Sequence, residues 1–135
     1  MQLGKGCQSG EPEDMKILLC DDSITVRKKL AQSVKSIIDC EIIEAANGQE
    51  AVKFYNENNP ELVFMDIVMP FMDGLEALEN IIAKDSSAKV IMLSSVGTKA
   101  NLQKALKSGA IDFVQKPWEN DRLKIVIQSH LKEGK

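Results

Sequence analysis

Acidic side chains end two of the short apolar runs in this sequence. Asp21 and Asp22 follow Lys16 to Cys20, and Asp66 follows Leu62 to Met65. Three carboxylates held together would repel one another, by about 4 kcal/mol for each pair 4 Å apart at an effective dielectric constant near 20. A hard divalent cation with oxygen ligands would relieve that repulsion. If the fold brings these acids together, the pattern predicts a magnesium site with Asp22 and Asp66 as the natural direct ligands.

Two other polar residues end apolar runs in the same way. Ser94 follows Val90 to Leu93, and Lys116 follows Ile111 to Gln115. The lysine is a mobile positive charge suited to a phosphoryl oxygen, and the serine hydroxyl can hydrogen-bond a second one. Asp66 is the middle carboxylate of the set and an available nucleophile, since aspartyl phosphates are established covalent intermediates. These residue types predict phosphoryl transfer beside a metal ion.

The apolar runs alternate with longer stretches in which hydrophobic residues recur at helical spacing. With a run at Glu41 to Ala45, there are five runs of strand length. The alternation predicts a doubly wound, flavodoxin-like α/β fold, a parallel sheet in the order 2-1-3-4-5 flanked by five helices. Right-handed crossovers would then bring all four polar strand ends to one edge. The expected inward stripes are Val26, Leu30, Val34 and Ile37; Leu75, Leu78 and Ile82; Leu102, Ala105 and Leu106; and Leu123, Val126 and Ile127.

Helix ends carry their own signals. Asn47 and Asp73 each precede a glutamate by three residues, which is capping-box spacing, and Thr98 can cap the fourth helix. Gly109 is expected to end that helix. The last helix is predicted from about Asp121 to Leu131.

Simpler explanations exist for these residues taken singly. Asp22 or Ser23 could cap the first helix, and Lys116-Pro117 could be only a turn, with a trans or a cis peptide bond. Ser94 could be an ordinary polar residue of a loop, without a role in a site. The joint occurrence of polar residues at four strand ends favours a site over separate local roles.

Composition bounds the class of protein. The chain has 135 residues, 44% hydrophobic and 27% charged, with a formal charge of -3. This is one globular domain without the cationic field that captures nucleic acid, and no apolar run is long enough for membrane insertion. We expect a cytoplasmic protein with a flexible extension over residues 1–14 and the domain over residues 15–135.

The cysteines and the histidine argue against other chemistry. Cys7, Cys20 and Cys40 are odd in number and widely spaced, and His130 is the only histidine. Zinc and a disulfide framework are therefore disfavoured. We expect Cys20 and Cys40 to be buried apolar residues, and His130 to be exposed near a helix C-terminus.

Four segments resemble the signature motifs of a known family. ILLCDDS, VFMDIVMPFMDG, IMLSS and DFVQKPW are similar to those of the receiver domains of two-component response regulators, especially the single-domain chemotaxis members. The likeness runs from about Met15 to the C-terminus. It implies a signalling phosphoacceptor module and not a turnover enzyme.

The resemblance also assigns roles. It implies that Asp66 accepts the phosphoryl group, that Asp22 and the Val68 carbonyl bind Mg²⁺, and that Asp21 orients a metal-bound water. Lys116 and Ser94 would hold the phosphate. Ser94 and Phe113 would form the switch. The family commonly has Thr at the position of Ser94 and an aromatic residue, often Tyr, at the position of Phe113.

Partners follow from the same likeness. It implies a sensor histidine kinase as phosphodonor. It also implies a target protein that binds the face formed by the fourth helix, the fifth strand and the fifth helix. Because no output domain follows Lys135 in this sequence, we expect the signal to leave through that surface.

Three other functions would share part of this sequence pattern. A Mg²⁺-dependent phosphohydrolase also uses an aspartyl nucleophile at a strand end, but it usually carries a second acid two residues later, where this sequence has Val68. A degenerate receiver would lack some of the five polar positions. A flavodoxin-like cofactor binder would need a glycine- or hydroxyl-rich phosphate loop after the first strand.

Overall fold

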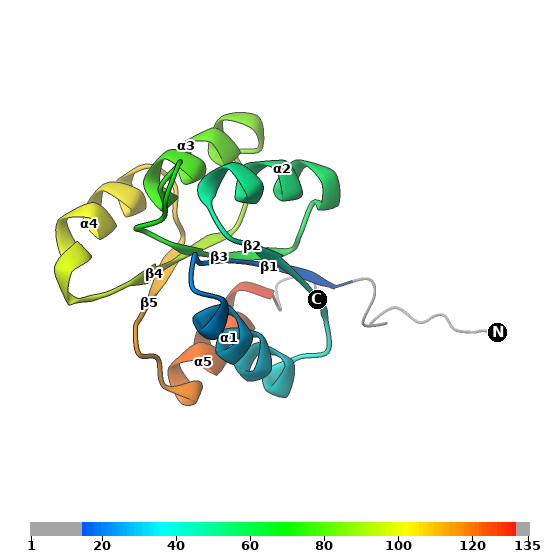
Figure 1. Cartoon of the computed structure of the whole chain (residues 1–135). Helices are drawn as coiled ribbons and strands as arrows, with labels where there is room; N and C mark the ends of the chain where they lie inside the picture. Colours follow the sequence, from blue (N-terminus) through cyan, green and yellow to red (C-terminus); the bar gives the residue numbers. More distant parts are fainter. Residues whose placement is uncertain (1–14, 132–135) are drawn as a thin grey trace.

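The computed structural model of the protein describes residues 15–131, a parallel sheet between two layers of helices (Figure 1). The strands are β1 (Lys16–Cys20), β2 (Glu41–Ala45), β3 (Leu62–Asp66), β4 (Val90–Ser94) and β5 (Asp112–Gln115). The helices are α1 (Ile24–Ile37), α2 (Gly48–Asn58), α3 (Gly74–Lys84), α4 (Lys99–Lys107) and α5 (Asn120–Leu131), with the short 3-10 helix η2 (Val96–Thr98) before α4. The predicted strands are confirmed, with ends that differ by at most one residue. The extension predicted for residues 1–14 lies outside the described residues.

The strand order is β2-β1-β3-β4-β5, as predicted. All neighbouring strands are parallel, and Cys20 of β1 pairs with Met65 of β3. The order reverses between these two strands, so the residues that follow the pair, Asp21 and Asp66, lie side by side at the switch point. This is the part of a doubly wound sheet where ligands bind.

The sheet is covered on both faces, which explains why its central strands are apolar except at their ends. Helices α2, α3 and α4 lie over one face and α1 and α5 over the other (Figure 1). The predicted inward stripes are confirmed at their centres, but Leu106 is 39% exposed and does not belong to the core. It lies in the last turn of α4, beyond the buried Leu102 and Ala105. The buried centres of the stripes are Leu30, Val34, Leu78, Leu102, Ala105, Leu123, Val126 and Ile127.

Side chains cap three helices at their first turns. Ser23, Asn47 and Asp73 each accept a hydrogen bond from the backbone N–H three residues further on. Thr98 takes the N-cap position of α4, but its side chain does not cap that helix. Its hydroxyl accepts from the Ser95 backbone N–H at 2.9 Å and donates to the Ser95 carbonyl at 3.0 Å, because the η2 turn already contains Thr98. The predicted Thr98 cap is therefore wrong.

Several single-residue predictions can also be compared with the structure. Gly109, with φ +123°, follows the end of α4, and the Lys116-Pro117 peptide bond is cis. Cys20 and Cys40 are buried free thiols. The exposed position predicted for His130 is wrong. Its side chain is three-quarters buried, with Nε2 3.0 Å from Asp112 Oδ2, because β5 places that carboxylate beside α5.

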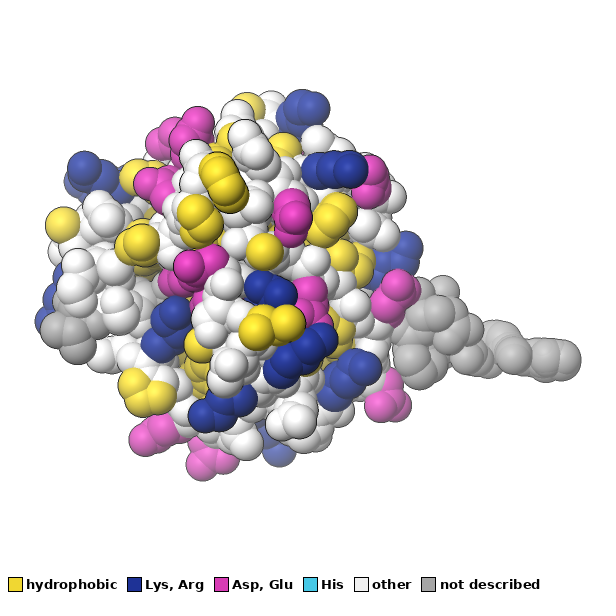
Figure 2. All heavy atoms as spheres, viewed as in Figure 1, with side chains coloured by type: hydrophobic (Ala, Val, Ile, Leu, Met, Phe, Trp, Pro, Cys, Tyr) yellow, Lys and Arg dark blue, Asp and Glu magenta, His cyan; other side chains and the backbone are white. Residues whose placement is uncertain are grey.

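The surface carries mixed charge. Figure 2 shows acidic and basic side chains interspersed over the face viewed, with no broad area of a single sign. Among residues 15–131, no helix has the length and hydropathy needed to cross a bilayer.

Candidate functional site

Three aspartates meet at the carboxyl edge of β1 and β3. One carboxylate oxygen from each of Asp21, Asp22 and Asp66 lies within 4.8 Å of the other two. Asp21 and Asp66 are buried, with exposures of 1% and 8%, whereas Asp22 is exposed. Two of the three carboxylates are therefore buried and the third faces solvent; we call this cluster, together with Lys116, the acidic pocket.

Lys116 reaches this pocket from the turn after β5. Its Nζ lies 3.1 Å from Asp21 Oδ2 and 3.3 Å from Asp66 Oδ1. Burial opposes the charged form of the lysine, but the hydrogen bond to Asp21 and the charge of Asp66 outweigh it and raise the Lys116 pKa. The lysine thus stays protonated against the two buried acids.

The positive charge of Lys116 does not fully compensate the negative charge of the three carboxylates. Burial, reinforced by the charge of Asp21, raises the pKa of Asp66 to about 6, although Lys116 and the Ile67 backbone N–H act in the opposite direction. A further cation would favour ionised Asp66. Three carboxylates are oxygen donors of the kind that hard divalent cations select, so the residues fit Mg²⁺.

Asp21 is fixed by groups that sequence reasoning did not single out. Its Oδ1 accepts from the Ser23 backbone N–H at 2.8 Å, and its backbone carbonyl accepts from Arg27 Nη1 at 2.7 Å. Arg27 is held in turn by Glu44 of β2, with Nε to Oε1 at 2.9 Å. The strand β2 contains two glutamates, Glu41 and Glu44, so the sequence does not indicate which of them takes this role.

Asp66 is positioned by the start of α3. Gly74 donates its N–H to the Ile67 carbonyl at 2.7 Å, and a Cβ added to Gly74 would overlap the backbone carbonyl of Asp66. Only a residue without a side chain allows α3 to begin this close to the strand end. Gly74 is the last residue of the segment VFMDIVMPFMDG, but the sequence analysis gave it no role in the site.

Ser94 and Phe113 lie on neighbouring strands and on one face of the sheet. Met92 pairs with Phe113 and Ser94 pairs with Gln115, so the two side chains lie two positions apart along the same face. Ser94 is 5% exposed, and Phe113 is half-buried against the core under α2, α3 and α4. The structure thus brings both residues of the predicted switch to adjoining strands, next to the acidic pocket.

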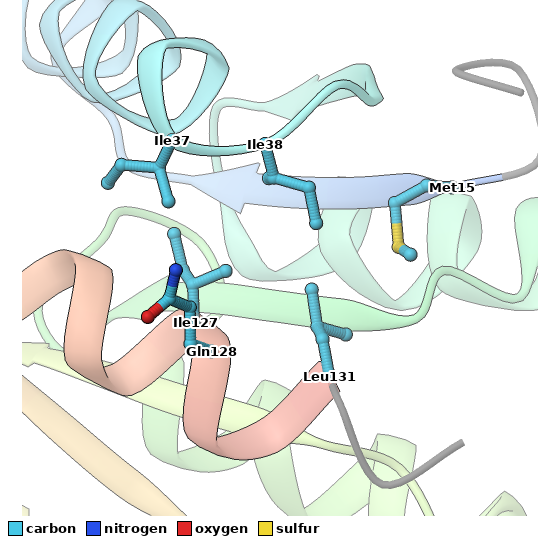
Figure 3. A pocket seen from close by; sticks show the side chains of 6 residues that line it. All are labelled: Met15, Ile37, Ile38, Ile127, Gln128 and Leu131. Atoms are coloured by element: carbon cyan, nitrogen blue, oxygen red, sulfur yellow. The ribbon is translucent and has the colours of Figure 1, made fainter. Parts of the chain in front are cut away.

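An apolar groove of about 470 Å³ lies at the opposite edge of the sheet, between the ends of α1 and α5 (Figure 3). Ile37 and Ile38 point across it toward Ile127 and Leu131, and Met15 closes one end. Among the described residues that line it, Gln128 is the only polar one. These residues offer no carboxylate, lysine or hydroxyl for phosphoryl or metal chemistry, in contrast to the acidic pocket.

The fold and the pocket define a class of protein. This is a doubly wound, flavodoxin-like α/β domain with an acidic site at the switch point of its sheet. The model of the response regulator receiver domain matches residues 17–128. The chain belongs to this family.

Relatives agree with this assignment. The chain is 49% identical over 110 residues to the chemotaxis protein CheY of Listeria monocytogenes, a match that covers 81% of this chain and 92% of that protein. It is 39% identical over 117 residues to CheY of Bacillus subtilis, covering 86% and 97%.

Solved structures show the same fold. CheY in a CheX-CheY complex with BeF₃ and Mg²⁺ from Borrelia burgdorferi superposes with a TM-score of 0.78 at 36% identity, covering 85% of this chain and 87% of that one. The response regulator domain of Thermotoga maritima CheB gives 0.76 at 33% identity, covering 86% and 95%.

Proposed function

We propose that this chain is a response regulator that accepts a phosphoryl group on Asp66 in a Mg²⁺-dependent reaction and signals by phosphorylation-dependent protein binding. One observation carries the proposal. Asp66 shares the pocket with two other aspartates and contacts the lysine. Asp21 also contacts the lysine, but it is more deeply buried and its other carboxylate oxygen already accepts from the Ser23 backbone N–H. The resemblance to chemotaxis proteins at up to 49% identity supports a place in a chemotaxis pathway.

The chemistry is a displacement at phosphorus. A carboxylate oxygen of Asp66 forms the new P–O bond while the bond from phosphorus to the donor's leaving atom breaks, and the leaving group departs with the electron pair. Lys116, 3.3 Å from Asp66 Oδ1, lies close enough to pair with an oxygen of the transferred group. Ser94 at the end of β4 supplies a hydroxyl for another oxygen.

Mg²⁺ fits the same pocket. Asp22, Asp66 and the Val68 backbone carbonyl would hold it, and Asp21 would orient one of its waters. Bound there, Mg²⁺ would neutralise charge on the transferring phosphoryl group. The open side at Asp22 gives such an ion access to water, which Mg²⁺ retains as part of its coordination shell.

Under this proposal, the product of the reaction is the protein phosphorylated on Asp66. A phosphohydrolase would place a second acid two positions after the nucleophile, where Val68 presents a side chain that is 60% exposed. We therefore propose phosphorylation from a donor and slow loss of the phosphate, without turnover of a substrate.

The phosphodonor would be a histidine kinase, and the output would be a target protein. The target would bind the face made by α4, β5 and α5, which includes the half-buried Phe113. If the Ser94 hydroxyl turns toward the phosphoryl group, space opens for the Phe113 ring to move inward. We place the protein in the cytoplasm, where its proposed kinase would act.

Mass spectrometry of the intact protein tests the proposal. With acetyl phosphate and Mg²⁺, the wild type should gain the mass of one phosphoryl group, and Asp66→Asn should gain none because an amide is not a nucleophile for this reaction. Omitting Mg²⁺ should slow the gain sharply. Asp73→Asn, an acid on the next loop with a capping role, is the matched control and should still be phosphorylated. Equal phosphorylation of Asp66→Asn would overturn the proposal.

A further inference from the structure

The ring of Phe113 is covered by a cation from another layer of the molecule. Phe113 lies in β5, the edge strand, and packs against the core under α2, α3 and α4. The guanidinium carbon of Arg122, from the first turn of α5, lies 5.7 Å from the ring centroid. This distance is within the range of a cation–π contact.

The guanidinium is held in place by two hydrogen-bond acceptors on β5. Arg122 Nη2 donates to the Phe113 backbone carbonyl at 3.0 Å and to Asp112 Oδ1 at 3.1 Å. Asp112 Oδ1 also accepts from the Phe113 backbone N–H at 2.8 Å, and Oδ2 lies 3.0 Å from His130 Nε2. Both hydrogen bonds come from the same nitrogen of the planar guanidinium, and its two acceptors lie on β5, so they keep the cation beside the Phe113 ring.

Arg122 links the two faces of the sheet. Asp112 pairs with Ile91, which belongs to the core under α1 and α5, whereas Phe113 pairs with Met92 of the opposite core. The side chain of Arg122 therefore starts in the α5 layer, passes the edge strand and reaches a ring on the other side. A bridge of this kind can hold the ring of an edge strand at the surface.

The same residues line a surface groove of about 400 Å³. Phe113 and Arg122 form part of its wall, together with Lys116 and Trp118. Lys116 also contacts the two buried aspartates of the acidic pocket. Movement of the Phe113 ring would therefore reshape a groove that already includes one residue of that pocket.

We infer that Arg122 is a positioning residue that holds the Phe113 ring in its half-buried position beside the cation, the outer position, until the acidic pocket is occupied. The inference rests on the proposed switch through Ser94 and Phe113. Phenylalanine has no hydroxyl to bond at the surface, so its outer position depends on contacts with the ring itself. Inward movement of the ring breaks the contact with the cation, while the hydrogen bonds of Arg122 to the β5 backbone and Asp112 can persist.

The test reads the ring directly. The chain has four phenylalanines, so 4-fluorophenylalanine gives four fluorine signals, and Phe113→Leu identifies one of them. Arg122→Gln removes the cation at a side chain that is 42% exposed, which should leave the fold intact. Lys124→Gln removes the same charge from an exposed position of the same helix and is the control.

Two results are expected. In the unliganded protein, Arg122→Gln should move the Phe113 signal toward its beryllofluoride-bound position, whereas Lys124→Gln should not. With Mg²⁺ present, beryllofluoride should bind Arg122→Gln about two- to fivefold more tightly than the wild type, the factor expected from a cation–π contact that only the outer state makes. Loss of a positive charge alone would weaken binding of an anion, so the direction of the change separates the two causes.

An unmoved Phe113 signal in Arg122→Gln, or beryllofluoride affinity equal to or weaker than that of Lys124→Gln, would overturn the inference. Ser94→Ala separates this from failure of the proposed switch. If beryllofluoride shifts the Phe113 signal equally in wild type and Ser94→Ala, the coupling through Ser94 is wrong. The role of Arg122 is then decided by the signal of the unliganded protein.

Discussion

The carboxyl group of Asp66 lies where burial and a neighbouring acid both oppose its ionisation. Its pKa in the metal-free fold is about 6, against an ordinary value of 3.8. Between these two values the folded chain binds the proton more tightly than the unfolded chain. The contribution of this group to the free energy of unfolding therefore falls as pH rises from about 4 to 6 and stays low above that.

Removing this charge should stabilise the metal-free protein. Asp66→Asn should raise the melting temperature at pH 7.5 by about 3 to 6 °C, which corresponds to about 1 kcal/mol after allowance for solvent screening. At pH 4 the gain should almost vanish, because the wild-type carboxyl is then largely protonated in the fold. Thermal melts in a chelating buffer at the two pH values provide the measurement. A gain that is equal at both values would show that ionisation of Asp66 is not its cause.

Single residues also mark the limit of what the sequence predicts. Asp21, Asp22, Asp66 and Lys116 could be brought together because each ends a recognisable strand. The Arg27–Glu44 pair could not, because it joins a helix face to a strand through a choice of rotamers that no spacing encodes. The pairing of His130 with Asp112 was missed for the same reason.

At the scale of elements, the approach of α3 to β3 determines where the Asp66 backbone lies. The helix starts at Gly74, against the carbonyl of Asp66, and its N-terminal turn is capped by Asp73. Any side chain at this position would push either the strand end or the helix start away.

Gly74→Ala should therefore destabilise the fold by about 1–3 kcal/mol, the usual cost of overpacking. It should also slow phosphorylation of Asp66 by acetyl phosphate, because the carboxylate would be displaced from Lys116. Gly97→Ala is the control, since a Cβ there meets no atom within 4 Å. Chemical denaturation and the rate of mass gain give the two readouts. Equal behaviour of the two variants would mean that the close approach of α3 does not matter.

The elements themselves could be predicted closely because their apolar periods agree with their caps. The errors fall where two local signals compete. Thr98 has the residue type of a helix cap, but it belongs to the preceding η2 turn, so its hydroxyl is used there. Leu106 continues the period of α4, but Ala105 is the residue of the last turn that faces the core, so Leu106 lies at the margin of the buried stripe.

At the scale of the molecule, the sheet separates two different edges. The acidic pocket lies at the carboxyl edge, and the apolar groove of Figure 3 lies at the other, between α1 and α5. The proposed output face begins at β5, the strand that Lys116 directly follows. The lysine therefore joins the start of that face to the aspartates through its ion pairs.

The rate at which a buried thiol is labelled can measure how often the fold opens. Cys20 is fully buried immediately before Asp21, and burial, aided by the nearby Asp21 charge, raises its pKa, so a thiol reagent can reach it as thiolate only when the strand opens. In a background with Cys7→Ser and Cys40→Ala, which leaves Cys20 as the one cysteine of the sequence, the rate of labelling would measure how often the strand opens.

Mg²⁺ prefers oxygen ligands, so it would change the rate of Cys20 labelling by binding the aspartates and not the sulfur. Mg²⁺ at ten times its dissociation constant should slow labelling of Cys20 about tenfold, since binding to the closed state alone reduces opening in proportion. Asp22→Ala should abolish most of that slowing, and mass spectrometry of timed samples measures both rates. Slowing that survives in Asp22→Ala would remove Asp22 from the ligands of the ion. The alkylation rate of a cysteine in the core would thus report how far the metal site is occupied.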